Sequence, residues 1–551
     1  MNMLRKKIVE ENTDGEGRLF NFRPCLFAAF FLCFGIVFAY LHIGYGLSAW
    51  WSLSLLPVLI LPYFLLRKKS AIVAGVGLTL AFFVGFVCYA GRASSFTATK
   101  FYNVEDATVY GRVTEISLYD GYSQLILDDV KLDGKSENGK LVAYLPATFA
   151  KNARCSDWVF LQGDLLTQID LFGKNAVRAE TFAADIRFRL DTDKDVYVSG
   201  HNFEPFAYIR EVLQDRLRAG VTEEGGTVAF ALLTGDTSGI EDGLLENMRV
   251  GGIAHIFAVS GLHIGTLFGV CVFLLSKWQR LNGNKGLKFV LTAAALLFYG
   301  GVCGYSESVV RAIVTCLVGY AFRLIGVKGD MLESLGLAAV LLLVINPVSL
   351  FCVGFQLSFA ACLGIATLAK PLQVWLERAY RNTVLRNRPF ETADYPVGYT
   401  RDGRGKVFAF LSVTVSAQAA TAPILLNSFG YLSAWGLLLN GVFVPLVGGL
   451  FSLTLAFVAI SCLLPAALSG VALWIPNVVW TVLLLVFEAV EFSVLFEGWR
   501  LNFATILSYY VLLLLCSDKL NLSQGCKFWL KLLFVFCFLL SFLTCAHAYI
   551  L

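Results

Sequence analysis

The sequence contains a series of apolar runs that are each long enough to cross a lipid bilayer. Residues 71–90, AIVAGVGLTLAFFVGFVCYA, carry no charged side chain, and residues 25–43 and 47–66 form an apolar pair joined by a short turn. A helix needs about 20 such residues to span roughly 30 Å of hydrocarbon. The chain has 551 residues, 57% hydrophobic and 15% charged, whereas soluble domains average about 25% charged residues. The sequence therefore predicts a polytopic α-helical membrane protein.

The number and direction of the spans follow from the apolar runs and the basic residues beside them. Including the three runs above, about 12–13 spans are expected, the others at 252–276, 287–303, 308–325, 331–346, 351–369, 407–426, 436–463, 468–492, 503–517 and 529–549. Basic clusters precede the first run and follow the second, at Arg67, Lys68 and Lys69. Cytoplasmic loops carry an excess of Lys and Arg, so the third span is expected to exit the cytoplasm. Residues 92–204 are then extracytoplasmic.

The segment 92–204 changes character, with short runs in which apolar and polar residues alternate. The runs are ATVYGRVTEISL, SQLILDDVKL, GKLVAYLP, DWVFLQGDLL and AVRAETFAADIRF. Period-two alternation between turn residues predicts short antiparallel strands, and five of them favour a small barrel such as an OB-fold. The segment has 13 basic and 17 acidic residues, so its charge gives no support for strong phosphate binding. Binding of single strands by aromatic stacking stays open for this domain.

Residues 205–219, PFAYIREVLQDRLRA, form a predicted amphipathic helix. Phe206, Ile209, Leu213 and Leu217 share one face, with Arg and Asp opposite. Such a helix lies on the membrane surface or packs against another part of the protein. The expected organisation is an anchor of three spans at 1–91, an OB-fold-like domain at 92–204, this helix and a linker at 205–225, and a membrane bundle at 226–551.

Four motifs in the membrane bundle resemble those of one known family. The stretch LLTGDTSGIEDGLLENMRVGGIAHIFAVSGLHIGTLFGV (232–270) is similar to the LLTGD turn and H-x-x-A-V-S-G-L-H element of the competence protein family typified by ComEC, a DNA uptake channel. YGGVCGYSESVVRAIV (299–314), INPVSLFCVGFQLSFAACLGI (345–365) and VSAQAATAPILLNSFGYLSAWGLLLNGVFVPL (415–446) resemble further family elements in the same order. The resemblance covers about residues 225–450.

The resemblance implies a channel that imports single-stranded DNA across the bacterial cytoplasmic membrane during natural transformation. It also implies partners, namely a DNA receptor protein, a cytoplasmic helicase-like ATPase and membrane lipid. No cofactor and no metal are expected. Many family members end in a metallo-β-lactamase-like domain, but after His263 this sequence has only His547. A histidine–aspartate metal cluster is therefore not expected here, and a separately encoded nuclease would degrade the other strand.

Two charged residues precede the span predicted at 252–276. Asp236 lies in a Gly-Asp turn, where it caps the following helix or places a charge at a pore mouth. Arg249 sits just before the span, where it contacts phosphate or lies at the membrane interface. The sequence leaves both choices open.

Three polar residues fall inside that predicted span. His255 and His263 are eight positions apart, about 80° around a continuous helix, so a shared metal is not expected. Each histidine lines a wet path or makes a hydrogen bond between helices. Ser260 and His263 are close enough in sequence to hydrogen-bond. Because no G-x-S-x-G elbow and no orienting acid are evident, no catalytic residue is assigned.

Glu307 and Arg311 are one helical turn apart on an otherwise apolar helix. A charge at mid-membrane costs about 3 kcal/mol on insertion scales, so a structural ion pair is the simplest account. The alternative is an Arg311 that faces the channel and meets a phosphate backbone.

Further polar side chains lie within later spans. Gln356 and Asn440 hold helices together or line a path. Asn440-Gly441, Pro445 and Gly448-Gly449 interrupt a long apolar run, which predicts either a broken helix at a substrate path or a kinked packing helix. The channel-lining hypothesis therefore includes Asp236, Arg249, His255, Ser260, His263, Arg311, Gln356 and Asn440.

Three rival functions remain beside DNA import. The same bundle would suit a transporter of another anionic or lipid-linked substrate, or an intramembrane enzyme built on Ser260 and His263. A degenerate relative that has lost transport is the third rival. DNA uptake by a deletion strain separates the first and third from the family function.

Overall fold

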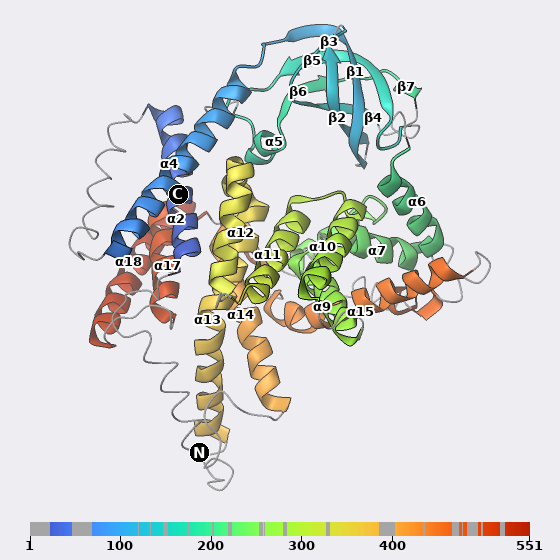
Figure 1. Ribbon diagram of the computed structural model, residues 1–551. Coiled ribbons are helices and arrows are strands. Elements are labelled where there is room, and N and C mark those ends of the chain that lie inside the picture. The colour runs from blue at the N-terminus through green and yellow to red at the C-terminus, as the bar shows by residue number, and fades with distance from the viewer. Residues whose placement is uncertain are drawn as a thin grey trace.

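The computed structural model combines a β-barrel with a bundle of helices (Figure 1). It describes residues 23–46, 69–118, 121–132, 134–146, 153–172, 176–200, 203–218, 223–252, 257, 259–278, 284–326, 331–384, 403–433, 436–464, 473–475, 478–481, 494–497, 500–517 and 524–550. The polytopic helical class with an inserted small barrel is confirmed.

The barrel closes through five strands. The strands of this domain are β1 (Asn103–Leu118), β2 (Tyr122–Leu132), β3 (Lys135–Ser136), β4 (Lys140–Pro146), β5 (Trp158–Thr167), β6 (Ile186–Asp191) and β7 (Tyr197–Gly200). The order is β1-β2-β4-β6-β5, and β1 also pairs with β5, which removes the open edges of the sheet. The β4–β6 pairing is parallel and the others are antiparallel. This arrangement confirms the OB-fold-like prediction.

Alternation in the strands decides which side chains fill the barrel. Along β2 the buried residues fall on alternate positions, so Leu125 and Leu127 point inward with no exposed surface. They pack with Val109 of β1, Leu161 of β5 and Phe188 of β6 in one core. Burial of this apolar face is what fixes the strand register.

The fifth predicted strand, residues 176–188, is wrong over most of its length. Residues Ala179–Ala183 form a short helix, α5, and the strand β6 begins only at Ile186. The sequence AETFA favours a helix through its two alanines and glutamate, and Phe182 and Ala183 are buried against the membrane bundle rather than inside the barrel. Tertiary packing therefore overrides the alternation seen in the sequence.

The helices account for most of the remaining described chain. They are α2 (Pro24–Tyr45), α4 (Lys69–Thr97), α6 (Pro205–Arg218), α7 (Glu223–Thr234), α8 (Asp242–Val250), α9 (Gly261–Lys277), α10 (Lys285–Val302), α11 (Glu307–Leu324), α12 (Met331–Ile345), the 3-10 helix η4 (Pro347–Phe351), α13 (Val353–Val384), α14 (Gly403–Phe429), α15 (Gly436–Leu463), α17 (Phe503–Cys516) and α18 (Gln524–Ile550). A small hairpin pairs β8 (Tyr431–Ser433) with β9 (Val494–Glu497).

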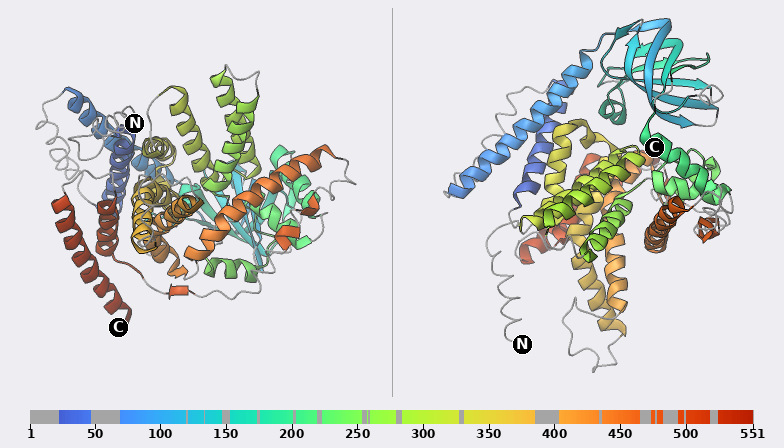
Figure 2. Two further views of the ribbon diagram at one scale, coloured as in Figure 1. Left: turned by 90° about the horizontal axis from the view of Figure 1, so that it is seen from below. Right: turned by 45° about the vertical axis from the view of Figure 1, so that its right-hand side comes forward.

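Six helices in the described part of the chain are long and apolar enough to span a membrane, and five shorter helices are apolar. The predicted spans 47–66 and 468–492 lie outside or largely outside the described residues, so the count of 12–13 spans stays a prediction. Figure 2 shows α13 and α14 running side by side below the barrel.

Two predicted spans differ in extent from the observed helices: the span 252–276, and the span 351–369, which α13 extends to Val384. The span predicted at 252–276 starts too early, because α8 ends at Val250 and α9 begins only at Gly261. Of the two alternatives predicted for 436–463, the structure shows the continuous packing helix and not the broken one, because α15 (Gly436–Leu463) runs without interruption through Pro445. Proline removes a single backbone donor, and a packed membrane helix tolerates that loss.

The amino-terminal pair of helices packs at backbone contact. An added side-chain carbon on Gly35 of α2 would overlap the Phe82 carbonyl oxygen of α4, and one on Gly85 of α4 would overlap the Leu32 carbonyl oxygen. Small residues permit this close approach, which is how helices associate in a membrane without a hydrophobic driving force. The pair in turn contacts the bundle, because Glu333 of α12 accepts hydrogen bonds from the backbone N–H groups at the start of α2.

The amphipathic helix α6 packs on the bundle with its apolar face. Leu217 has no exposed surface, and the ring of Phe206 lies directly against Gly301 at the end of α10. The packed alternative of the sequence prediction therefore describes this face, rather than burial in a membrane surface. Arg210, on the same helix, reaches toward Gly304.

Candidate functional site

A buried arginine near the start of α11 is the most unusual polar group of the bundle. The side chain of Arg311 is 7% exposed, and its nearest carboxylate is Glu307 one turn earlier, with Nη1 and Oε2 3.7 Å apart. That distance exceeds a hydrogen bond. Glu307 is itself 49% exposed, and Nε and Nη1 of Arg311 have no hydrogen-bond partner among the described residues. A buried cation without hydrogen bonds is energetically costly.

The surroundings of the Arg311 guanidinium come from the first turn of α13. The central carbon of the group lies 6.0 Å from the centre of the Phe355 ring. Gly354 faces it without a side chain, since even an added carbon there would stay 3.8 Å from Nη1 and Nη2. Phe355 stacks on Phe359 one turn later, with ring centres 4.2 Å apart. The guanidinium thus rests on apolar and backbone groups that supply no counter-charge.

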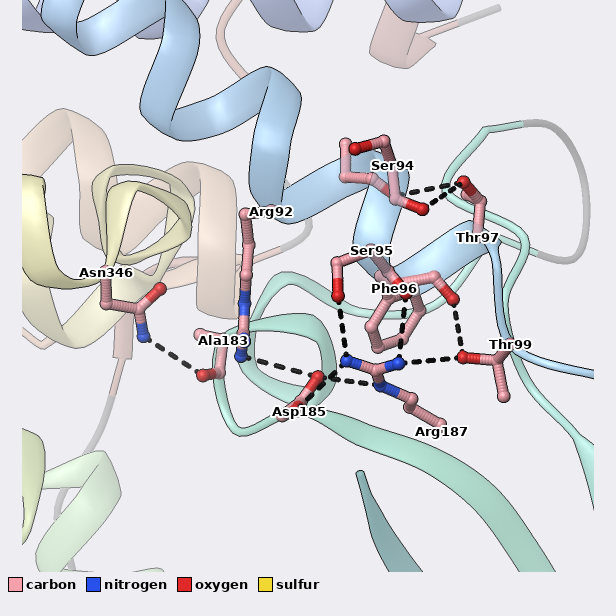
Figure 3. Close-up of polar contacts among 11 residues, drawn as sticks. Arg92, Ser94, Ser95, Phe96, Thr97, Thr99, Ala183, Asp185, Arg187 and Asn346 are labelled. Carbon is pink, nitrogen blue, oxygen red and sulfur yellow. Dashed lines mark hydrogen bonds and ion pairs between the residues drawn. The ribbon is translucent and has the colours of Figure 1, made fainter. Parts of the chain in front are cut away.

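A second arginine of equal burial shows what a structural role requires. Arg187 of β6 is 5% exposed and Arg311 is 6% exposed. The Arg187 guanidinium donates to Asp185, the Ser95 carbonyl, and the hydroxyls of Ser95 and Thr99 (Figure 3). It also lies over the ring of Phe96, and Arg92 of α4 approaches the same Asp185 carboxylate at 3.4 Å.

These contacts join the barrel to the end of α4, so Arg187 is a clamp. A second link lies close by, where the Asn346 amide donates to the carbonyl of Ala183 in α5 (Figure 3). Arg311 is as buried as Arg187, but among the described residues its guanidinium lacks the hydrogen-bond acceptors that Arg187 has. The two arginines therefore have different roles.

Two helical stretches near Arg311, one on α11 and one on α13, are half-buried along their length. Residues 314–322 of α11 are all half-buried, with none fully buried and none exposed. Residues 356–369 of α13 are likewise half-buried apart from Gly364. A helix packed between protein and lipid normally shows a buried face and an exposed face. These stretches show neither face, so nearly every residue in them keeps part of its surface accessible.

Ser260 and His263 form the amino-terminal cap of α9. The Ser260 hydroxyl accepts the N–H of Leu262, and His263 Nδ1 accepts the backbone N–H of Ser260 at 3.1 Å. Nδ1 also lies 3.3 Å from the Ser260 hydroxyl. The reciprocal arrangement is a capping box in which a histidine takes the place usually held by Glu or Gln. His263 is 1% exposed and meets the ring of Phe451 of α15 edge-on.

The angle of 80° predicted between the two histidines is wrong, because no continuous helix joins them. Ser260 has an extended backbone, and α9 begins after it. His255 itself lies outside the described residues. The Ser260–His263 hydrogen bond that the sequence spacing predicts is consistent with the observed 3.3 Å contact.

Replacing Ser260 by alanine is expected to lower the free energy of unfolding by about 1 kcal/mol, because one helix-end donor loses its acceptor. Thermal melting of the purified protein measures this loss. Ser260→Asp keeps an acceptor at the cap and is expected to restore the melting temperature. An unchanged melting temperature in Ser260→Ala would contradict the capping role.

The remaining predicted site residues occupy separate places. Asp236 accepts the backbone N–H of Ser238 within the turn after α7. Arg249 is exposed at the end of α8 and pairs with Glu246 at 3.2 Å. Gln356 donates its amide to the Leu350 carbonyl of η4. The Asn440 side-chain oxygen is buried with no hydrogen-bond partner among the described residues.

Asp236 lies on the side of the bundle that faces the barrel. Burial raises the pKa of the Cys155 thiol in the barrel. The positive charge of Arg210 lowers that pKa and the negative charge of Asp236 raises it, so both groups lie near the thiol. Asp236 is therefore close to the joint between barrel and bundle.

Among the described residues, the structure brings together two pairs of the predicted residues rather than one continuous set. Glu307 and Arg311 lie at the contact between α11 and the start of α13, where Gln356 follows Phe355 in sequence but bonds to η4. Ser260 and His263 lie at the α9–α15 contact. The clamp residue Arg187 was missed in the sequence. Its signal is weak, because an arginine in an alternating strand ordinarily points to solvent.

Comparison with known proteins gives one family match. A family model described as competence protein matches residues 232–522. The ComE operon protein 3 of Bacillus subtilis (strain 168) is 27% identical over 246 residues, which cover 45% of this chain and 26% of that protein. An uncharacterized protein of Mycoplasma pneumoniae, the MG316 homolog, is 34% identical over 131 residues, covering 22% of this chain and 32% of that protein.

The chain thus aligns with about a quarter to a third of the length of the curated relatives that it matches. No solved structure matches the chain. The four motifs quoted from the sequence all lie within the matched residues 232–522.

Proposed function

The chain belongs to the competence protein family, and we propose that it forms a channel that imports single-stranded DNA across the cytoplasmic membrane during natural transformation. The family match supports a role in DNA uptake. The spanning helices support a multi-pass protein of the cell membrane. The single observation that carries the channel proposal is Arg311, a buried guanidinium with unused hydrogen-bond donors.

A phosphodiester supplies the negative charge and the hydrogen-bond acceptors that the Arg311 guanidinium lacks among the described residues. Each phosphate carries one negative charge and oxygen acceptors that fit the planar fork of a guanidinium. Among the residues that the structure describes, only the exposed carboxylate of Glu307, at 3.7 Å, competes for the group. A passing phosphate can therefore replace Glu307 without breaking a hydrogen bond. A weak, exchangeable contact suits conduction, because tight binding would stall the strand.

The other candidate residues extend this proposal along the bundle. The Asn440 side-chain oxygen on α15 has no hydrogen-bond partner among the described residues, and it would accept from N–H groups of the bases rather than contact phosphate. The half-buried stretches of α11 and α13 are proposed to border the path. Asp236 is a proposed charge at the mouth of the path, Arg249 a proposed phosphate contact, and His255 a proposed lining residue. The proposed partners are a DNA receptor protein and a cytoplasmic helicase-like ATPase, which would supply direction and energy.

Uptake of radiolabelled DNA by a deletion strain tests the function. We expect DNA protected from added nuclease to fall to background in the deletion and to return when the intact gene is restored. Export or import of lipid-linked and small anionic compounds should be unchanged in the same strain. Normal DNA uptake by the deletion strain would end the proposal and favour a transporter of another substrate.

A further inference from the structure

A row of aromatic side chains crosses the outer surface of the barrel at one register position. Tyr110 of β1 lies opposite Phe160 of β5, and Phe160 lies opposite Tyr197 of β7. Trp158, two residues before Phe160 and thus on the same face, stacks on Tyr110 with ring centres 5.0 Å apart and planes 11° apart. We name Tyr110, Trp158, Phe160 and Tyr197 the aromatic ladder.

The ladder is open at the β7 end. Phe160 is 40% exposed and Tyr197 is 73% exposed. β7 lies on the side of the barrel remote from α4 and α5, so the clamp to the bundle is away from this strand (Figure 1). Neighbouring strands are about 4.8 Å apart, so the three cross-strand rungs extend over about 10 Å. That length is comparable to two linked sugar rings or two stacked bases.

A hollow of about 350 Å³ adjoins the open rings. Phe160, Gln162 and Tyr197 line it together with the turn Asp193-Lys194-Asp195. The Lys194 ammonium is paired with Asp106, which also accepts a hydrogen bond from Gln162. Asp193 and Asp195 have no ion pair or hydrogen bond with any described residue. The hollow therefore combines an aromatic wall with unused carboxylate acceptors.

The charge around the hollow, at the open end of the ladder, disfavours a polyanion there. Among the residues that line the hollow, Lys194 is the one cation, and Asp106 neutralises it. At the other end of the ladder Arg112 pairs with Asp129 at 3.3 Å, and Lys131 lies over the ring of Tyr110, 5.9 Å from its centre. The segment 92–204 carries 13 basic and 17 acidic residues. Nucleic acids are held through phosphate neutralisation, and each phosphate brought here would meet Asp193 and Asp195.

We propose that the aromatic ladder binds the sugar rings of a neutral polysaccharide of the cell envelope. Aromatic faces carry negative charge density, which attracts the polarised C–H groups of a sugar ring, and the carboxylates of Asp193 and Asp195 accept its hydroxyl protons. With the barrel on the outer side of the membrane, as the basic clusters predict, such a ligand lies directly opposite it. The ladder then anchors the outer domain to the envelope, a role separate from DNA conduction.

Calorimetric titration of the full-length protein in detergent tests this site with two probes. The probes are chitohexaose, a neutral oligomer of N-acetylglucosamine, and a twelve-residue oligothymidylate. We expect chitohexaose to bind the wild type, and Phe160→Ala and Tyr197→Ala each to weaken that binding by about fivefold to tenfold. Phe160→Tyr retains a ring and is expected to retain binding.

Tyr122→Ala is the matched control, because Tyr122 is a 43% exposed tyrosine of β2 outside the ladder. Its chitohexaose affinity should equal that of the wild type. Absence of chitohexaose binding by the wild type would overturn the proposal, as would equal affinities across all variants. Loss of oligothymidylate binding in the ladder variants, without chitohexaose binding, would assign the surface to nucleic acid instead. None of these outcomes depends on DNA transport.

Discussion

Arg311→Met is expected to reduce DNA uptake to the level of the deletion strain while the protein stays folded in the membrane. Methionine fills a similar volume without a charge. Replacing a buried, poorly paired ion by an apolar side chain is neutral or stabilising by about 1–4 kcal/mol. We therefore expect the thermal melting temperature to stay constant or rise while nuclease-protected uptake disappears. Loss of function with retained stability marks a residue kept for function.

Two control variants make this result specific. Arg323→Met removes an exposed arginine from the last turn of the same helix and is expected to leave uptake unchanged. Glu307→Gln removes the competing carboxylate, and we expect uptake to be retained. If Glu307 and Arg311 form only a structural ion pair, Glu307→Gln should instead lower the melting temperature and reduce uptake in proportion. That outcome, or normal uptake by Arg311→Met, would contradict the phosphate contact.

The sequence predicts the fold class because its periodicities are strong. Uncharged runs such as 71–90 leave no alternative to a membrane helix, and alternation gives four of the five barrel strands. The sequence prediction fails where tertiary packing determines the secondary structure. Residues 176–188 continue the alternation of a strand, yet the burial of Phe182 and Ala183 against the bundle makes α5 a helix.

The candidate site was predictable only as a set of residue types. Spacing indicates that Ser260 and His263 interact, but it does not reveal that the helix starts between them. Spacing also makes Glu307 and Arg311 look like an ordinary ion pair. Their difference in burial, and the apolar floor supplied by Phe355 from a distant helix, appear only in three dimensions. A period of 3.6 residues carries no information about which other helix a side chain meets.

Arg187→Met is expected to loosen the attachment of the barrel to the end of α4. This change leaves Asp185 with Arg92 at 3.4 Å as its remaining cation, and it leaves the Ser95 carbonyl without the Arg187 donor. Breaking a buried pair by removing one partner costs about 3–5 kcal/mol. The barrel core around Val109 and Leu161 is untouched, so the barrel itself should stay folded.

Limited proteolysis at residues 98–102, between α4 and β1, measures the loosening of Arg187→Met, and we expect cleavage to become at least tenfold faster. Arg189→Met is the matched control, since Arg189 lies two residues further along β6 and pairs with Asp191 at a half-exposed site. An exposed pair contributes about 0–1 kcal/mol, so cleavage of this variant should match the wild type. Equal cleavage of the two variants would show that burial and acceptor number do not set the strength of the clamp. The same result would weaken the proposal for Arg311. That proposal depends on the difference between Arg187, which has hydrogen-bond acceptors, and Arg311, which lacks them among the described residues.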